Sequence, residues 1–286
     1  MTRQVQTFLL SMAFIAAIHP PAQAADYEEA MDAVRHGNLK GGYQILIPLA
    51  QAGDARAQNG LGVMLQNGYN GSVDMEKAIM WFYMAADSDL PEAQYNLGLI
   101  YAKGEGVSQD YQEAAKWYEK AANHGIYQAQ FKLATILLEG RNGRADHEGA
   151  ATWYRKAADR GMLKAMTALA SMYQKGQGLP MDLSEAVKWL RKAAQKGEIM
   201  AQYKLGQAYA AGRGVKVNHG KAFKWHIAAA TQGYHLAQLS VGNMFFEGRG
   251  ARRDINLAKR WWKRAANQGN PDAQLLLEKL KQNEDM

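Results

Sequence analysis

The chain has 286 residues, of which 48% are hydrophobic and 21% are charged. This composition is too apolar for a disordered polymer and indicates a folded protein. The chain contains no cysteine, which excludes disulfides, thiol nucleophiles and zinc sites built on thiolates. A formal net charge of +7 permits weak attraction to acidic partners, but it does not by itself indicate binding of nucleic acid.

Residues 1–24 have the pattern of a secretory signal peptide. Arg3 gives a basic start, residues 8–18 form an apolar run, and Ala22-Gln23-Ala24 fits a small-x-small cleavage site. The run is too short to span about 30 Å of hydrocarbon as a helix, although an uncleaved anchor is the alternative. We expect cleavage near Ala24-Ala25, a mature protein that is periplasmic or secreted, and no membrane span.

Residues 25–52 are expected to form a degenerate N-terminal helix pair ahead of a repeat array. Leu49-Ala50 lies 36 residues before Ala85-Ala86, as a repeat would require. Ile45 stands where the later repeats have a tryptophan.

Residues 53–268 hold six repeats with a period of 36 residues. The alanine columns that begin at Ala57 and Ala78 keep this step, as does the glycine column that begins at Gly68. The tryptophan column consists of Trp81, Trp117, Trp153, Trp189, Trp225 and Trp261. A fixed period of this size is typical of a solenoid, whose units bury a hydrophobic face only by stacking.

Each repeat has the pattern of two helices, as residues 89–124 illustrate. The first helix carries apolar residues at helical spacing and ends at Gly104, because glycine accepts the left-handed conformation of a helix C-cap. Asp110 is the expected N-cap of the second helix. The predicted fold is all-α, a right-handed α-solenoid of antiparallel helix pairs with a 36-residue repeat, and the handedness is inferred by analogy. Residues 269–286 are expected to form a C-terminal capping helix.

The sequence offers few groups for catalysis or metal binding. His147 and His219 share a column but lie two repeats apart, too far to bind one metal ion. His226 replaces an aromatic residue found at Tyr118 and Tyr154, which favours a packing role. The glycine-x-glycine motifs lack the strand–turn–helix setting of a phosphate site and are interpreted as turns between helices. We therefore predict that the chain is not an enzyme and holds no metal or cofactor.

Recognition surfaces are expected where the repeats differ. In a helical projection, the first helix of each repeat leaves exposed the columns that begin at Arg56, Asn59, Gly60 and Val63. Large side chains in the first two columns suit capture of an extended peptide or a helix, although packing against the next repeat is the alternative. The candidate partner-binding residues are Tyr95, Phe131, Met200, Tyr203, Leu236 and Leu239.

The second helices predict two further surfaces. Lysine and arginine form a basic outer ridge that begins at Lys116 and ends at Arg264, and that suits an acidic envelope polymer or an acidic protein. A solvated face is the alternative interpretation of the ridge. In the first repeat the ridge gives way to Met80, Tyr83 and Met84, a candidate exposed apolar patch for the N-terminal helices or a partner.

The repeat resembles the Sel1-like repeat family, which is related to tetratricopeptide repeats. The resemblance covers residues 53–286 and is carried by Ala93-Gln94-Tyr95-Asn96-Leu97-Gly98, by Tyr101-Ala102-Lys103-Gly104-Glu105-Gly106-Val107, and by Ala114-Ala115-Lys116-Trp117-Tyr118. It implies an adaptor that binds a protein or peptide, as in exported members that act in envelope signalling or assembly. The alternatives are a β-lactam-interacting or other envelope hydrolase and a scaffold for envelope polysaccharide export. The cysteine pairs that mark the β-lactam branch are absent here.

The sequence departs from the family pattern around the third and fourth repeats. Met166 replaces the glutamine that the other five repeats have at this position, and Arg141-Asn142-Gly143-Arg144 replaces the usual glycine-x-glycine-valine turn. These departures predict a bend or a looser joint in this region.

Overall fold

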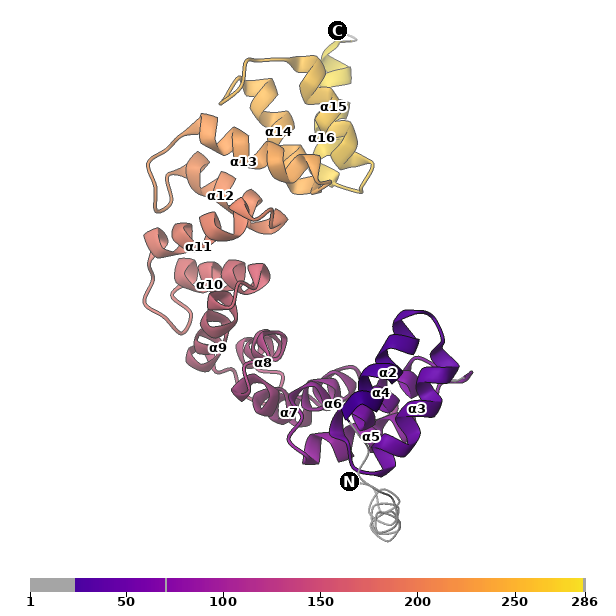
Figure 1. The fold of residues 1–286 in the computed structure, drawn as a ribbon. Helices are drawn as coiled ribbons and strands as arrows, with labels where there is room; N and C mark the ends of the chain where they lie inside the picture. Colours follow the sequence, from indigo (N-terminus) through magenta and orange to yellow (C-terminus); the bar gives the residue numbers. More distant parts are fainter. Residues whose placement is uncertain (1–23, 70, 285–286) are drawn as a thin grey trace. The chain divides into compact units, whose positions relative to one another are not determined.

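The computed structural model describes residues 24–69 and 71–284, and in these ranges all regular structure is helical (Figure 1). The predicted signal peptide, apart from its last residue, lies outside the described residues. The helices are α2 (Ala24–Arg35), α3 (Leu39–Gln51), α4 (Ala55–Gln66), α5 (Met75–Asp87), α6 (Pro91–Lys103), α7 (Tyr111–Asn123), α8 (Tyr127–Glu139), α9 (His147–Asp159), α10 (Leu163–Lys175), α11 (Leu183–Gln195), α12 (Ile199–Ala211), α13 (His219–Thr231), α14 (His235–Glu247), α15 (Ile255–Ala266) and α16 (Pro271–Glu284).

The chain divides into two compact units, Met1–Ala145 and Asp146–Met286. In the first unit each helix from α2 to α7 packs on the helix that follows it, and in the second unit the same holds from α9 to α15. The division follows residues 141–144, the turn at which the sequence departs from the repeat pattern. Packing between successive helices is the arrangement of a solenoid, so the predicted all-α fold of stacked helix pairs is confirmed.

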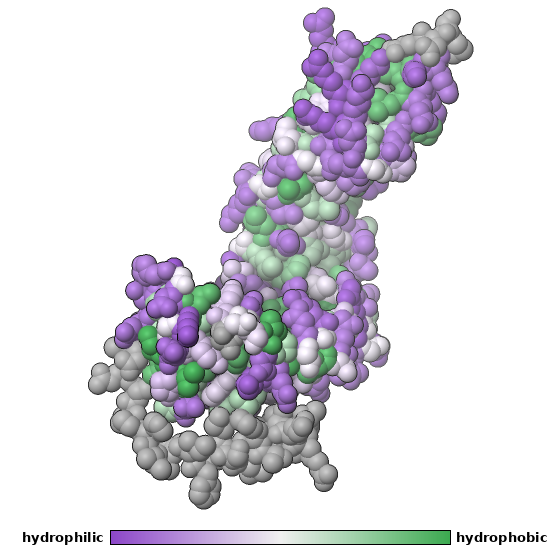
Figure 2. All heavy atoms as spheres, turned by 90° about the vertical axis from the view of Figure 1, so that its right-hand side faces the viewer, coloured by the Kyte–Doolittle hydropathy of each residue, from purple (hydrophilic) through white to green (hydrophobic). Residues whose placement is uncertain are grey.

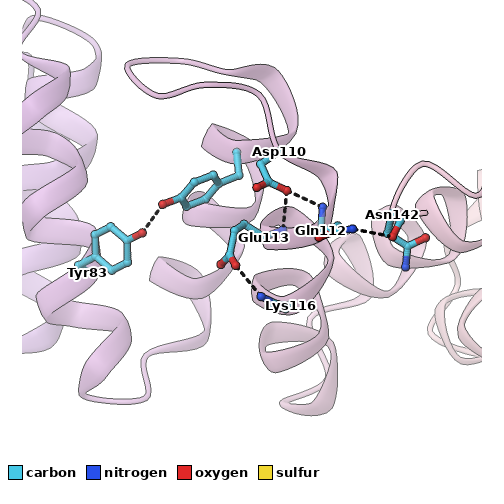
Figure 3. Close-up of polar contacts among 7 residues, drawn as sticks. Tyr83, Asp110, Gln112, Glu113, Lys116 and Asn142 are labelled. Atoms are coloured by element: carbon cyan, nitrogen blue, oxygen red, sulfur yellow. Dashed lines mark hydrogen bonds and ion pairs between the residues drawn. The ribbon is translucent and has the colours of Figure 1, made fainter. Parts of the chain in front are cut away.

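The second helix of each repeat starts at the predicted cap. The Asp110 carboxylate accepts hydrogen bonds from the backbone N–H groups of Gln112, at 2.8 Å, and Glu113, at 3.0 Å (Figure 3). These bonds satisfy donors that the first turn of a helix leaves unpaired. The same role is played by Asp74, Asp146, Asp182, Asn218 and Asp254.

The glycine-x-glycine motifs are turns, as predicted, and the two glycines have different tasks. Gly104 ends α6 with a φ of 75°, in the left-handed region that favours glycine. Gly214, a second glycine of its motif, packs directly on the backbone carbonyl of Leu183 at the start of α11, where a Cβ atom would overlap that carbonyl. The turn after the first helix of one repeat thus contacts the second helix of the preceding repeat.

The interior combines buried alanines with large aromatic side chains. Ala93 and Ala114 are completely buried, and the tryptophans Trp81, Trp117, Trp189 and Trp261 are buried while Trp153 and Trp225 are half-buried. Small residues let the helices approach closely. An added Cβ at Gly98 would lie 2.5 Å from the Tyr118 ring, which fills this space from α7.

A buried glutamine joins successive repeats. The Gln202 side-chain amide on α12 donates a hydrogen bond to the Ala194 carbonyl near the end of α11, at 3.2 Å. The same bond is made by Gln58, Gln130 and Gln238 to the carbonyls of Ala50, Ala122 and Ala230. In the fourth repeat Met166 occupies this buried position, so this side-chain bond to the backbone is lost there.

Candidate protein-binding surfaces

Most of the predicted partner-binding residues are partly buried by their own neighbours. Tyr95, Phe131, Tyr203 and Leu239 form one column and are half-buried. The Tyr203 ring lies 5.1 Å from the Tyr234 ring and 5.4 Å from the His226 ring, measured between centroids. Leu239 packs on the hydrophobic cluster around Trp262. This column therefore contributes to packing between repeats, and binding by its residues stays a prediction.

The column that begins at Arg56 lies nearer to the solvent. Arg56, Glu92, Lys164 and Met200 are exposed, and Met200 keeps 36% of its surface accessible. Leu236, in the same column, is half-buried. Figure 2 shows, on the face that it presents, hydrophobic side chains in small groups between hydrophilic ones. The exposed positions of this column thus differ in charge and polarity from one repeat to the next.

The patch predicted on the first repeat is not exposed at two of its three residues. Met80 and Tyr83 are 8% and 9% exposed, and Met84 is half-buried. Met80 and Tyr83 belong to a core cluster that includes Ala30 and Leu46 from the N-terminal helices. The expectation failed because their burial depends on neighbouring helices, which a projection of α5 alone does not contain.

Tyr83 also has a specific partner in the next repeat. Its hydroxyl forms a hydrogen bond with the Tyr101 hydroxyl (Figure 3). Its ring also meets the Trp117 ring edge-on, with 5.7 Å between the ring centroids. Burial, together with this hydrogen bond, raises the pKa of Tyr83. At the equivalent position of the third and fourth repeats an arginine makes the same link, as when Arg191 donates to the Tyr209 hydroxyl at 3.2 Å. Tyr83 therefore joins two repeats.

Part of the basic outer ridge packs on the tryptophan column. The Lys120, Lys156 and Lys192 ammonium groups lie 4.3, 4.0 and 4.2 Å from the centroids of Trp117, Trp153 and Trp189. The Arg264 guanidinium lies 4.5 Å from the Trp261 ring centroid. A cation–π contact whose cation lies at the protein surface contributes about 0.5–1 kcal/mol. These basic residues thus cover the tryptophans from solvent, in addition to carrying charge.

A cavity of about 390 Å³ lies between the C-terminal halves of α12 and α14, with α13 as its floor. Gln207, Ser240 and Asn243 line it, and Arg213 and Arg249 belong to the flanking turns. These residues were not predicted as site residues. Gln207 and Asn243 lie in the column that begins at Val63, and Ser240 lies in the column that begins at Gly60. Their signal in the sequence was a change to polar residues in two columns already expected to be exposed.

His226 forms the floor of this cavity and is 3% exposed. Its ring packs on Gly206, where an added Cβ would lie 2.8 Å away, which confirms its predicted packing role. Burial lowers the pKa of His226 to about 4, so the ring is neutral at pH 7. Its Nδ1 atom has no hydrogen-bond partner among the described residues, and such an unpaired buried atom costs about 1–3 kcal/mol.

A second cavity, of about 190 Å³, occupies the equivalent place between α6 and α8 in the first unit. Each of its main lining residues lies 108 residues, or three repeats, before a lining residue of the larger cavity. Tyr118 takes the place of His226, is 1% exposed, and carries a hydroxyl with no partner among the described residues. Burial raises the pKa of Tyr118. In both cavities the floor residue thus carries a buried polar atom that has no partner among the described residues.

Two kinds of feature are absent from the described residues. No group of three or more His, Asp or Glu side chains there is placed to hold a metal ion. Within the same residues, no helix combines the length and the apolar character needed to cross a membrane.

Comparison with known proteins gives a match to one family model and similarity to solved structures. The family model described as "Sel1 repeat" matches residues 55–90, 91–126, 128–162, 163–198, 199–234 and 235–270. A solved structure of a protective antigen present in uropathogenic Escherichia coli strains, described as having an SLR fold, is 35% identical with a TM-score of 0.80. That match covers 82% of this chain and 50% of the antigen, so this chain spans half of the antigen's length.

A solved Sel1 repeat protein from Oxalobacter formigenes is 27% identical with a TM-score of 0.74, over 85% of this chain and 97% of that one. No curated protein sequence matches the chain. The six matches of the family model cover most of the chain, and the chain belongs to the Sel1 repeat family.

Proposed function

We propose that this chain is a non-catalytic adaptor that binds a protein or peptide partner through exposed positions that vary between its repeats. The observation that carries the proposal is the contrast between two kinds of column. The column that contains Ala93 is completely buried wherever it is described and keeps its residue type from repeat to repeat. The column that contains Arg56, Lys164 and Met200 is exposed at these residues and changes from basic to apolar.

This contrast supports recognition because a solenoid needs only its packing columns to fold. A substitution in an exposed column leaves the stacking of repeats unchanged, so these positions are free to match a partner. Membership of a family that generally provides protein-interaction scaffolds supports the same conclusion. We further propose that the protein is periplasmic or secreted, which rests on the signal-peptide pattern of residues 1–24 and the cleavage expected near Ala24-Ala25.

Site-specific photo-crosslinking in living cells tests partner binding. A photoreactive amino acid at Met200 in the second unit and at Arg56 in the first places the probe at exposed positions of the variable column. The same probe at Gln195, an exposed residue at the end of α11, is the matched control. We expect one discrete adduct from Met200 or Arg56 and none from Gln195. Absence of adducts at both test positions, or equal labelling of the control, would contradict the proposal.

Two simpler measurements test the remaining parts. Cell fractionation with mass spectrometry of the N-terminus should find a chain that begins at Ala25 outside the cytoplasm; an intact chain confined to the cytoplasm would disprove export. A chromogenic β-lactam assay on the purified protein should show no turnover. Turnover that a point substitution abolishes would favour the alternative of an envelope hydrolase.

A further inference from the structure

The floor of the cavity between α12 and α14 is a polar ring that packing does not require. The position of His226 is occupied by Phe82 in the first repeat and by Leu190 in the fourth, and both are fully buried hydrophobic side chains. Phe82 rests on Gly62 as His226 rests on Gly206. A hydrocarbon side chain therefore fills this place, yet in the fifth repeat the floor carries an imidazole whose Nδ1 atom is unpaired.

The walls of the cavity offer both donors and acceptors. The Gln207 amide donates to the Tyr203 hydroxyl and the Ser240 hydroxyl donates to the Leu236 carbonyl, both at 2.9 Å. The Asn243 side-chain oxygen accepts a hydrogen bond from the Trp262 indole at 2.9 Å, which turns the NH₂ group of Asn243 to the other side of its amide. Arg249 is engaged by Glu247, with 3.1 Å between Nε and Oε2. The Arg213 side chain has no ion-pair partner in the described part of the chain. One guanidinium and one amide NH₂ group thus remain available to a ligand.

The cavity in the first unit has other residues at these positions: Glu105 takes the place of Arg213, and Thr135 takes the place of Asn243. Glu139 forms an ion pair with Arg141, and these two residues lie three repeats before Glu247 and Arg249. Lys132 lines this cavity and is exposed, whereas the Lys103 ammonium group is ion-paired with Glu105 at 3.1 Å. Basic side chains therefore outnumber acidic ones around both cavities, and in both the floor is a buried polar group, Tyr118 or His226.

We propose that the cavity between α12 and α14 binds a carboxylate group of the partner peptide, with Arg213 and Asn243 as its principal donors and His226 at its floor. This inference rests on the proposed function and specifies the chemistry that the adaptor recognises. A carboxylate fits because it accepts several hydrogen bonds and because its negative charge would give Arg213 an ion-pair partner. A volume of about 390 Å³ lies in the range of small-ligand sites and accommodates a side chain with the adjoining backbone.

A random peptide library displayed on phage provides a defined probe for this inference. The library is panned on the purified full chain at low ionic strength, and the peptides that bind are synthesised for affinity measurements. We expect aspartate or glutamate at a fixed place in these peptides. Replacement of that residue by glutamine or asparagine should weaken binding about tenfold, because it removes one charge-assisted contact. Amidation of the peptide C-terminus distinguishes a side-chain carboxylate from a terminal one.

Matched variants locate the binding site. Arg213→Glu should weaken the peptide's binding about tenfold or more, whereas Arg252→Glu, the same charge change at an exposed residue outside the cavity, should have a much smaller effect. His226→Phe should also weaken binding while the melting temperature of the protein does not fall. In a chain labelled with ¹³C at its histidines, the His226 signal, identified by its loss in His226→Phe, should shift when the peptide is added.

Each contrary outcome has a definite meaning. Peptides that bind without an acidic residue, or equal losses in the Arg213 and Arg252 variants, would overturn the carboxylate site while leaving partner binding intact. Succinate that shifts the His226 signal as strongly as the peptide would assign the site to a small free anion and would overturn the peptide ligand. A library that yields no binder would overturn the inference alone if the Met200 crosslink still traps a partner, and the proposed function as well if it does not.

Discussion

Acid should destabilise the second unit through His226. The ring is neutral in the folded protein down to a pKa of about 4, whereas an unfolded chain binds the proton near the ordinary value of 6.5. As the pH falls below 6.5 the unfolded state therefore binds protons that the folded state does not. Stability is lost between pH 6.5 and pH 4, and this residue contributes no further change above or below that window.

The magnitude follows from the size of the shift. Each unit of pKa difference corresponds to about 1.4 kcal/mol, so the full loss is about 3 kcal/mol, with about 2 kcal/mol lost by pH 5. His226→Phe removes the titrating group while keeping a ring over Gly206, as Phe82 does over Gly62. The variant should be at least as stable as the natural chain at pH 7, and its advantage should grow as the pH falls.

Urea unfolding followed by tryptophan fluorescence, at fixed ionic strength between pH 4 and pH 8, measures this advantage. His219→Phe, which removes an exposed histidine from the same helix, controls for the loss of one imidazole. If His226→Phe loses stability with acid as steeply as the natural chain does, His226 does not titrate as a buried group. The account of the cavity floor would then be wrong.

Three further substitutions test the packing, each by thermal and urea unfolding. Gly98→Ala should destabilise the first unit by about 1–3 kcal/mol because its Cβ would lie 2.5 Å from the Tyr118 ring. In an exposed helix this change usually stabilises by about 1 kcal/mol, and such a gain here would contradict the close contact. Trp189→Ala should lower the free energy of unfolding by about 3–5 kcal/mol, and hydrogen exchange should rise first in α10 and α12. A loss of stability below about 1 kcal/mol would show that the indole does not fill the interface. Gln202→Met should cost about 1 kcal/mol by removing the bond to the Ala194 carbonyl, and an unchanged midpoint would refute that role.

The sequence alone predicted the elements whose causes are local. A cap requires only a short polar side chain before the first turn, and Asp110 therefore could be identified without a structure. The end of α6 likewise depends on one residue, Gly104, and its tolerance of a positive φ. The period of 36 then fixed how these local elements follow one another, because each repeat can bury its hydrophobic face only against the next.

Exposure was harder to predict because it depends on side chains from other repeats. Tyr203 lies on the solvent side of α12 in a helical projection, but Tyr234 of the next repeat packs against its ring. Tyr83 lies on the outer side of α5, but Tyr101 and Trp117 cover it. The cavity was missed for the converse reason, since the small residues Ala210 and Ala211 leave unfilled space beside α14. A pattern within one helix records neither effect.

One pair of columns explains how polar side chains can occupy the interior without a change of fold. A small residue on the first helix of a repeat receives a larger side chain from the second helix, and within each unit the pair must match in size. The pairs in contact are Gly62 with Phe82, Gly98 with Tyr118, Gly206 with His226 and Gly242 with Trp262. Their fillers range from hydrocarbon to phenol, imidazole and indole, so packing constrains the volume at this position and leaves its hydrogen-bonding capacity free. Because the position also forms the floor of the cavities between successive first helices, a single buried residue changes the chemical character of that floor.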